Sequence, residues 1–131
     1  MGTVAQHRAA IKDNIETVLS ATVRDYESLG IPSGIVYTVS WPDSFNPHAD
    51  QGTARDIVYP VRFECPWGDD KAADDKLEAA MQSIVAAIES DPTLNGACDD
   101  LACGPFVDIG AVTKPDETRW MTFVVPVEVF D

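Results

Sequence analysis

Apolar residues near the start of the chain recur at steps of three and four, which is the spacing of one face of an α-helix. Ile11 and Ile15 mark this stripe, and charged residues occupy positions between them. Thr3 and Gln6 have the spacing of a capping box at the beginning of the helix. A glycine and a proline follow the last apolar turn, so we expect a helix over Val4–Leu29.

The next two apolar runs alternate with polar residues, which is typical of strands with one buried face. Pro60 falls within the second of these runs, and Pro126 falls within a similar alternating run near the end of the sequence. Because proline donates no ladder hydrogen bond, we expect each to lie in an edge strand or to interrupt the pairing. The expected elements are the strands Ile35–Trp41 and Ile57–Cys65, the helix Asp70–Ser90, and the strands Phe106–Thr113 and Arg119–Phe130.

The order helix, strand, strand therefore occurs twice, which suggests a duplicated unit, although no residue-level similarity between the halves is visible at this point. A length of 131 residues fits one domain, and we assign residues 1–131 to it. The predicted fold class is α+β, with two helices packed on a mainly antiparallel four-stranded sheet. A long polar loop, residues 42–56, is expected between the first two strands.

The charge of the chain narrows the range of partners. It carries 22 acidic and 9 basic residues, a net charge of −13. Such a surface repels phosphate backbones and anionic membranes, which argues against direct binding of nucleic acid or lipid. No apolar run approaches the roughly 20 residues of a membrane helix, and no signal peptide is visible, so residence in a cytoplasm is expected.

Candidate catalytic chemistry is sparse. The histidines, His7 and His48, stand in polar surroundings without a marked nucleophile, and we expect both to be solvated. Asp99 and Asp100 have the composition of a cation-binding pair but are also common in loops. From these residues we predict a protein that is not an enzyme and holds no metal or cofactor. The three cysteines are too widely spaced for a usual zinc motif and are Cys65, Cys98 and Cys103.

Two regions are candidates for contact with partners. The loop after Trp41 is longer than hairpin connections usually are and holds a lone aromatic residue, which favours a binding arm, unless that residue packs into its own core. The candidate arm residues are Phe45, Asn46, Pro47 and His48. Apolar side chains on the second face of the sheet are either exposed for a partner or covered by a two-sided core. These are Val36, Val58, Trp120 and Val124.

The layout resembles the tail-terminator family of long-tailed phages, which includes minor tail proteins of lambda-like and actinobacterial siphophages. The resemblance rests on the helix Val4–Leu29, the hairpin of Ile35–Trp41 with Ile57–Cys65, the helix Asp70–Ser90, and the closing run Trp120–Val127. It spans nearly the whole chain and rests on layout and size, without a specific motif. The loop Ala97–Pro105 has no counterpart in that family.

The resemblance implies a structural virion protein that forms a hexameric ring at the head-proximal end of the tail tube. Such a ring stops tube polymerisation and joins the tail to the head connector, while DNA passes through an acidic lumen without specific binding. Implied partners are further copies of the chain, the tail tube protein and the connector. Three alternatives stay open: a head-closure protein of the neck, a small-ligand-binding domain with an apolar pocket near Tyr37 and Trp41, and an enzyme using Asp99, Asp100 or a Cys/His metal site.

Overall fold

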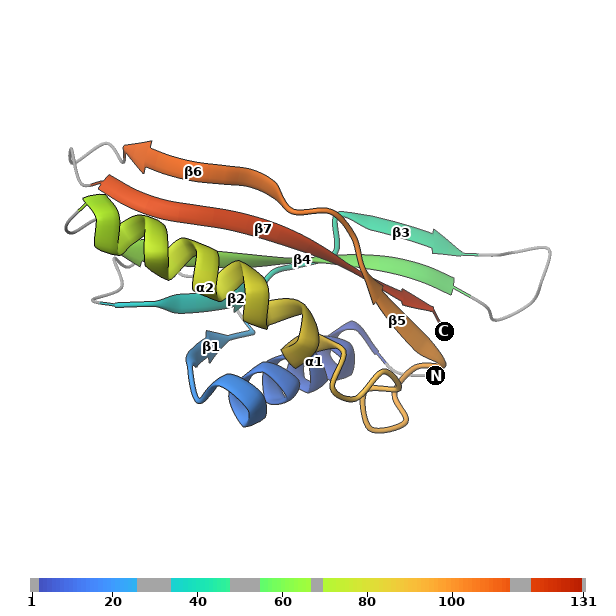
Figure 1. Ribbon diagram of the computed structural model, residues 1–131. Coiled ribbons are helices and arrows are strands. Elements are labelled where there is room, and N and C mark those ends of the chain that lie inside the picture. The colour runs from blue at the N-terminus through green and yellow to red at the C-terminus, as the bar shows by residue number, and fades with distance from the viewer. Residues whose placement is uncertain (1–2, 26–33, 48–54, 67–69, 114–118, 131) are drawn as a thin grey trace.

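Two long antiparallel strands, β4 (Arg55–Pro66) and β7 (Arg119–Phe130), form the centre of the molecule (Figure 1). They pair without a break from Asp56 opposite Phe130 to Pro66 opposite Trp120. The computed structural model describes residues 3–25, 34–47, 55–66, 70–113 and 119–130.

Each central strand is flanked by two shorter antiparallel strands that follow one another along it. The strands β2 (Val36–Val39) and β3 (Ser44–Pro47) pair with β4. The strands β5 (Asp100–Cys103) and β6 (Val107–Thr113) pair with β7. A further strand, β1 (Thr22–Arg24), pairs with β2 in parallel. The predicted four-stranded, mainly antiparallel sheet is therefore wrong, because the described residues form a curled, mixed sheet of seven strands.

The two prolines explain why the flanking strands are interrupted. Pro60 and Pro126 are paired with each other, so they lie in central strands and not at edges. Neither has an N–H to offer to the strand on its outer side. The pairing therefore breaks in the neighbouring chain, between β2 and β3 opposite Pro60 and between β5 and β6 opposite Pro126. The predicted interruption is present, but it lies in the strand beside each proline.

The first helix, α1 (Val4–Leu19), begins at the predicted capping box of Thr3 and Gln6. It ends ten residues before Leu29, which corrects the expected boundary. Ser20 has a left-handed backbone conformation (φ 50°), and its N–H bonds the carbonyl oxygen of Glu16, which terminates the helix. The β-branched residues that follow pair with β2 as β1 and do not continue the helix. The second helix is α2 (Asp70–Ile88).

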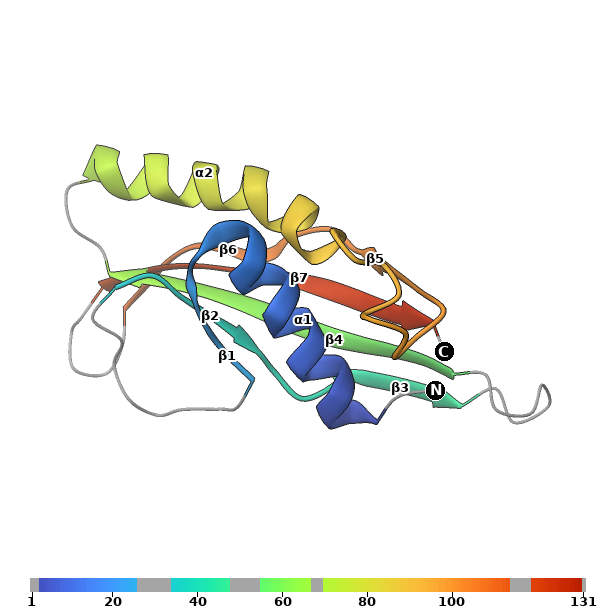
Figure 2. The ribbon, with the colours of Figure 1, turned by 90° about the horizontal axis from the view of Figure 1, so that it is seen from below.

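Both helices cover the same side of the sheet (Figures 1 and 2). Their apolar side chains, such as Ile15 of α1 and Ile84 of α2, join the odd-numbered residues of β4 and β7 in one core. A row of aromatic rings crosses this core from strand to strand, with neighbouring ring centroids 4.7–5.4 Å apart. The row consists of Tyr37, Phe63, Phe123 and Phe106.

The strand register exposes a duplication that the sequence pattern alone did not show. The displacement along the chain that takes Pro60 to Pro126 also takes the first residue of α1, Val4, to the first residue of α2, Asp70. Under it, Ile57–Phe63 (IVYPVRF) aligns with Phe123–Val129 (FVVPVEV), with the V-x-P-V core identical. The two halves therefore share a short sequence match that the apolar pattern did not reveal. The predicted order of two αββ units is wrong, however, because four strands follow α1 and three follow α2 along the described chain.

Candidate functional site

Within the described residues, both helices lie on one side of the central strands, and the other side is not covered by a helix. Val58 and Val124, two of the predicted surface residues, lie half-buried on this side. The other two are buried, with 5% of Val36 and 1% of Trp120 exposed, so of the two alternatives left open by the sequence these two residues follow the covered one. Each lies where a further strand flanks the sheet, β1 beside Val36 and β6 beside Trp120. A role of any of the four in a protein interface stays a prediction.

The predicted binding arm is partly a strand. Phe45, Asn46 and Pro47 lie in β3, where Phe45 is opposite Ile57 of β4. The expected continuous loop over residues 42–56 is therefore wrong, because β4 begins at residue 55 and offers backbone partners to residues 44–47. His48 lies outside the described residues, and contact of these four residues with a partner stays a prediction.

Trp41 is the most exposed large apolar residue of the described chain, with 62% of its surface accessible. It lies in the interruption between β2 and β3, where the backbone leaves β4. The guanidinium of Arg8 lies 5.0 Å from the centre of its ring, in a cation–π contact. Arg8 is itself buried and donates from Nε and Nη2 to the carbonyl oxygen of Val39, at 3.0 and 2.8 Å. Trp41 is therefore an exposed aromatic side chain with a fixed support.

A hollow of about 420 Å³ adjoins Trp41. It opens beside the strand interruption, where the flanking strand departs from β4. Apolar, acidic and basic groups share its wall, which offers no single chemistry for a small ligand. The residues around it include Ser40, Pro42, Asp43, Pro60, Arg62 and Val124.

The alternation along the chain predicts a strand over Ile35–Trp41, in which Tyr37, Val39 and Trp41 share one face. Tyr37 is indeed in the core, with its ring 5.4 Å from that of Phe63. The strand ends at Val39, however, and so the alternation does not extend to Trp41. The break follows Ser40, whose N–H donates to the carbonyl oxygen of Pro60, so locating it from the sequence requires knowledge of the register.

A second hollow, of about 500 Å³, lies between α2 and the start of β6. Its apolar wall is formed by Leu77 and Met81 of α2 and by Phe106, and we call it the α2 groove. Phe106 is the outer end of the aromatic row and meets Phe123 edge-on at 5.2 Å. Asp74 and Glu78 lie at the rim, both exposed. The α2 groove is thus an apolar surface with an acidic border, and the sequence did not indicate that these residues form a binding surface.

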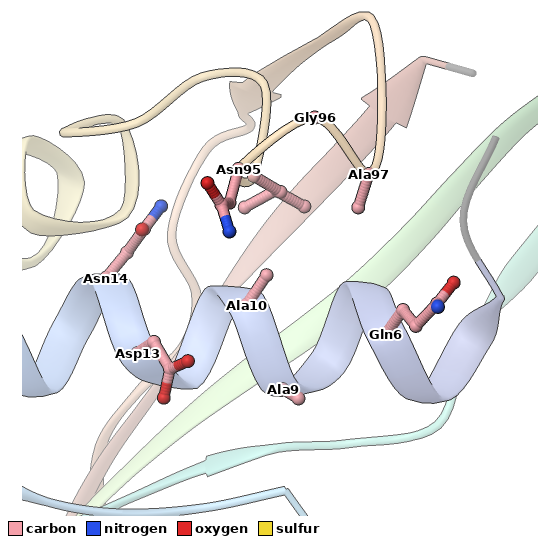
Figure 3. Close-up of a pocket in the computed structure, with 9 residues that line it drawn as sticks. Gln6, Ala9, Ala10, Asp13, Asn14, Asn95, Gly96 and Ala97 are labelled. Atoms are coloured by element: carbon pink, nitrogen blue, oxygen red, sulfur yellow. The ribbon is translucent and has the colours of Figure 1, made fainter.

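A third hollow, of about 460 Å³, separates α1 from the loop Leu94–Ala97 (Figure 3). Asn14 and Asn95 both extend into the space between them. The Asn14 side chain donates from Nδ2 to the carbonyl oxygens of Ile88 and Asp91, at 3.0 and 3.2 Å, and so caps the end of α2. The side chain of Asn14 therefore already has a role in stabilising the fold.

The loop beside this hollow has an uncommon backbone. Leu94, Asn95 and Gly96 have φ angles of 50°, 57° and 86°, all in the left-handed region. The Asp91 carboxylate accepts a 2.8 Å hydrogen bond from the Asn95 N–H, and Leu94 is buried in the core. A buried anchor and a side-chain bond thus stabilise a conformation that costs free energy locally.

His7 is fully buried, which corrects the expectation that it is solvated. Its Nε2 lies 3.0 Å from the carbonyl oxygen of Ala97, which can only accept, so Nε2 carries a proton. Its Nδ1 lies 2.8 Å from the hydroxyl of Tyr59, a buried residue of β4. His7 thereby joins α1, the central sheet and the loop Leu94–Ala97. His48 lies outside the described residues.

The thiols and carboxylates of the described chain do not gather into a metal site. No group of three or more His, Cys, Asp or Glu residues among them could hold a metal ion. Cys65, Cys98 and Cys103 are free thiols. Burial raises the pKa of Cys65, and burial together with the charge of Glu89 raises the pKa of Cys103 to about 12. Both are therefore poor nucleophiles at neutral pH, since the thiolate is the reactive form.

Asp99 and Asp100, the predicted acidic pair, lie at the beginning of β5 and are exposed. The Asp99 N–H donates to the carbonyl oxygen of Phe130, at 2.9 Å, in line with the strand pairing. The Asp100 carboxylate accepts from the Leu101 N–H, at 2.8 Å. Through these hydrogen bonds both residues contribute to the edge of the sheet.

Neither the protein-family models nor the curated proteins contain a match to this sequence. Within the part of the chain that the structure describes, no helix is long and apolar enough to cross a membrane. The main surface features of the described chain are Trp41, the uncovered sheet face and the α2 groove.

Proposed function

We propose that this protein is a structural subunit of a phage tail, a tail terminator that assembles with copies of itself into a ring, most simply a hexamer. The observation that carries the proposal is the set of large apolar side chains exposed near the edges of the sheet. Trp41 is one of them, and exposed aromatic residues of this kind commonly anchor protein interfaces. On β6, Val107, Ile109 and Val112 are exposed as well.

The charge of the chain supports the same function. A ring at the end of a tail tube must let DNA pass without gripping it. A net charge of −13 repels the phosphate backbone. In this proposal the ring belongs to the tail and neck of the virion, and its subunits are present in the host cytoplasm during assembly.

The proposed partners follow from the ring. Copies of the chain contact each other through the apolar edges, the tail tube protein binds one side of the ring, and the head–tail connector binds the other. The segment Phe45–His48, which begins in β3, is the proposed contact with the tube or with a neighbouring subunit. Val58 and Val124, on the uncovered sheet face, are proposed to meet a neighbouring protein.

One rival in the same class is a head-closure protein of the neck, which would also form a ring. A small-ligand-binding domain is the rival from another class, and it requires an apolar pocket near Tyr37 and Trp41. Tyr37 is buried against Phe63, whereas Trp41 points out beside Arg8. These two aromatic residues therefore do not share a pocket wall, which favours the structural role.

Negative-stain imaging of the purified full-length protein tests the proposal. Six-fold rings are expected, and particles no larger than one domain would overturn it. Addition of the ring to the purified tube protein encoded near it separates the two structural roles. A terminator caps the tubes and shortens their length distribution, whereas a head-closure protein leaves the tubes unchanged.

A further inference from the structure

We infer that the ring is closed by a knob-and-hole contact, in which Trp41 of one copy inserts into the α2 groove of the next copy. The inference rests on the proposed function, because it specifies the contact between the subunits of that ring. It concerns two apolar features that stay exposed or open within the described chain. These are the exposed indole of Trp41 and the apolar groove of Leu77, Met81 and Phe106.

Trp41 has the properties of a preformed anchor. Its position in the short interruption between β2 and β3 projects it from the sheet, and 62% of its surface is accessible. The Arg8 guanidinium supports one part of the ring, and Arg8 is fixed by two hydrogen bonds to the carbonyl oxygen of Val39. A side chain held in this way loses little conformational entropy when a partner covers it. Burial of an aromatic residue of this size removes roughly 150–250 Å² from water.

The α2 groove has the properties of a receiving site. Its volume of about 500 Å³ is within the range of sites that hold an organic group. Phe106 closes one side and is braced by Phe123, and Leu77 and Met81 form the other side. A flexible methionine adapts its shape to an inserted ring and makes favourable sulfur–aromatic contacts.

The positions of Trp41 and the α2 groove in the sheet indicate that the indole in the groove comes from a neighbouring copy. The strand order β1-β2-β4-β7-β5 puts Trp41, after β2, at one edge of the sheet and Phe106, after β5, at the other. A knob at one edge and a hole at the opposite edge give a head-to-tail contact, in which every copy both inserts and receives. Such a contact closes into a ring when the rotation between neighbours permits it. A ring is the assembly proposed above.

Charge favours the same pairing. The groove is bordered by the carboxylates of Asp74 and Glu78, both exposed on α2. The guanidinium of Arg8 lies 5.0 Å from the indole of Trp41, and Asp43, Arg62 and Asp108 line the hollow next to it. Insertion of the indole brings the Arg8 cation toward the acidic rim, and the attraction strengthens as water is excluded.

The test uses three full-length variants. Trp41→Ala removes the knob and keeps the hole, whereas Met81→Glu keeps the knob and places a charge in the hole. Val18→Ala is the matched control, because it removes an apolar side chain of α1 with similar exposure (49%) that is part of neither feature. Far-UV circular dichroism and the melting midpoint establish that each variant is folded. Should Met81→Glu fail to fold, Gln82→Trp, which fills the groove from its exposed rim, takes its place.

Each variant is then studied by size-exclusion chromatography with light scattering. The control is expected to form the wild-type ring, and each of the other variants alone is expected to be monomeric. A 1:1 mixture of Trp41→Ala with Met81→Glu is expected to give a dimer that grows no further, because it retains one intact knob and one intact hole. A ring formed by Trp41→Ala, or a mixture that stays monomeric, would overturn the inference and leave the ring intact as a proposal. A monomeric wild type would instead refute the proposed function.

Discussion

Pro60 and Pro126 face each other across the two central strands, in register, at the centre of the sheet. Each turns its carbonyl oxygen outward to the next strand, where Ser40 donates to Pro60 at 3.0 Å and Gly104 donates to Pro126 at 2.7 Å. The two hydrogen bonds occupy equivalent places in the two halves. The pair therefore marks the point about which the duplicated units are arranged.

In each half, a charged side chain forms a hydrogen bond with the backbone of an edge strand, and the two side chains carry opposite charges. In the first half, Arg8 donates to the carbonyl oxygen of Val39, beyond the last residue that β1 covers. In the second half, the Glu89 carboxylate accepts from the N–H of Cys103, at 3.3 Å. Val39 and Cys103 pair with the equivalent residues Val61 and Val127. Each unit thus uses a charged side chain to satisfy one free backbone group of its edge strand.

Gly104→Ala tests the close approach at the centre of the second unit. A Cβ at this position would lie 2.9 Å from Cγ of Pro126, in a strand that cannot retreat without loss of its pairing. We expect the free energy of unfolding to fall by about 1–3 kcal/mol, measured by urea denaturation. Gly34→Ala is the control, because nothing lies within 4 Å of its Cβ position. Equal midpoints for the two variants would show that the contact at Pro126 is not restrictive.

Much of the layout was accessible from the pattern of apolar residues, because alternation and helical spacing are local properties. The boundary of α1 was missed because Thr22 and Val23 continue the helical spacing, and only their pairing with β2 makes them a strand. The strand β3 was missed because Phe45 and its neighbours do not alternate clearly. Its formation depends on the extension of β4 to residue 55, which is a matter of register.

The similarity between the two halves is present in the sequence, but it is recognised only once the strand register pairs Pro60 with Pro126. The identical positions Val58 and Val124, Pro60 and Pro126, and Val61 and Val127 are too few to stand out in a chain of this composition. The candidate site was less predictable from the sequence than the fold. The α2 groove joins residues from α2 with Phe106, and His7 is buried by contacts to residues 59 and 97, so tertiary structure creates both features.

His7→Ala tests the bridge between α1, β4 and the loop Leu94–Ala97. The substitution removes the hydrogen bonds to Tyr59 and Ala97 and leaves a cavity, so we expect a loss of about 2–4 kcal/mol in unfolding free energy. Tyr59→Phe removes one of these bonds and should cost about 1–2 kcal/mol. Because the two residues interact, the double variant should lose less than the sum of the single losses. Strict additivity in chemical denaturation would contradict the bridge.

The buried phenol of Tyr37 predicts a loss of stability in alkali. Burial, with a smaller effect from the charge of Cys65, raises the pKa of Tyr37 from 10.0 to about 12. Between these values the unfolded chain has released the proton that the folded chain still holds, so the free energy of unfolding falls as the pH rises. Tyr37→Phe should flatten this fall.

The measurement is a series of urea denaturations from pH 9 to 12, made in a Cys103→Ser background. That background is needed because the pKa of Cys103, raised to about 12, affects stability in the same direction. An equally steep fall in the Tyr37→Phe variant would show that Tyr37 does not retain its proton in the folded protein.

The mass of the purified full-length protein in its native state tests the central claim most directly. Native mass spectrometry after exchange from roughly 0.15 M salt, at which surface charges are screened beyond about 8 Å, resolves multiples of the 14.2 kDa chain. A ring-forming tail subunit predicts one dominant species at six times that mass. A spectrum that contains only the 14.2 kDa monomer across micromolar concentrations would contradict the account.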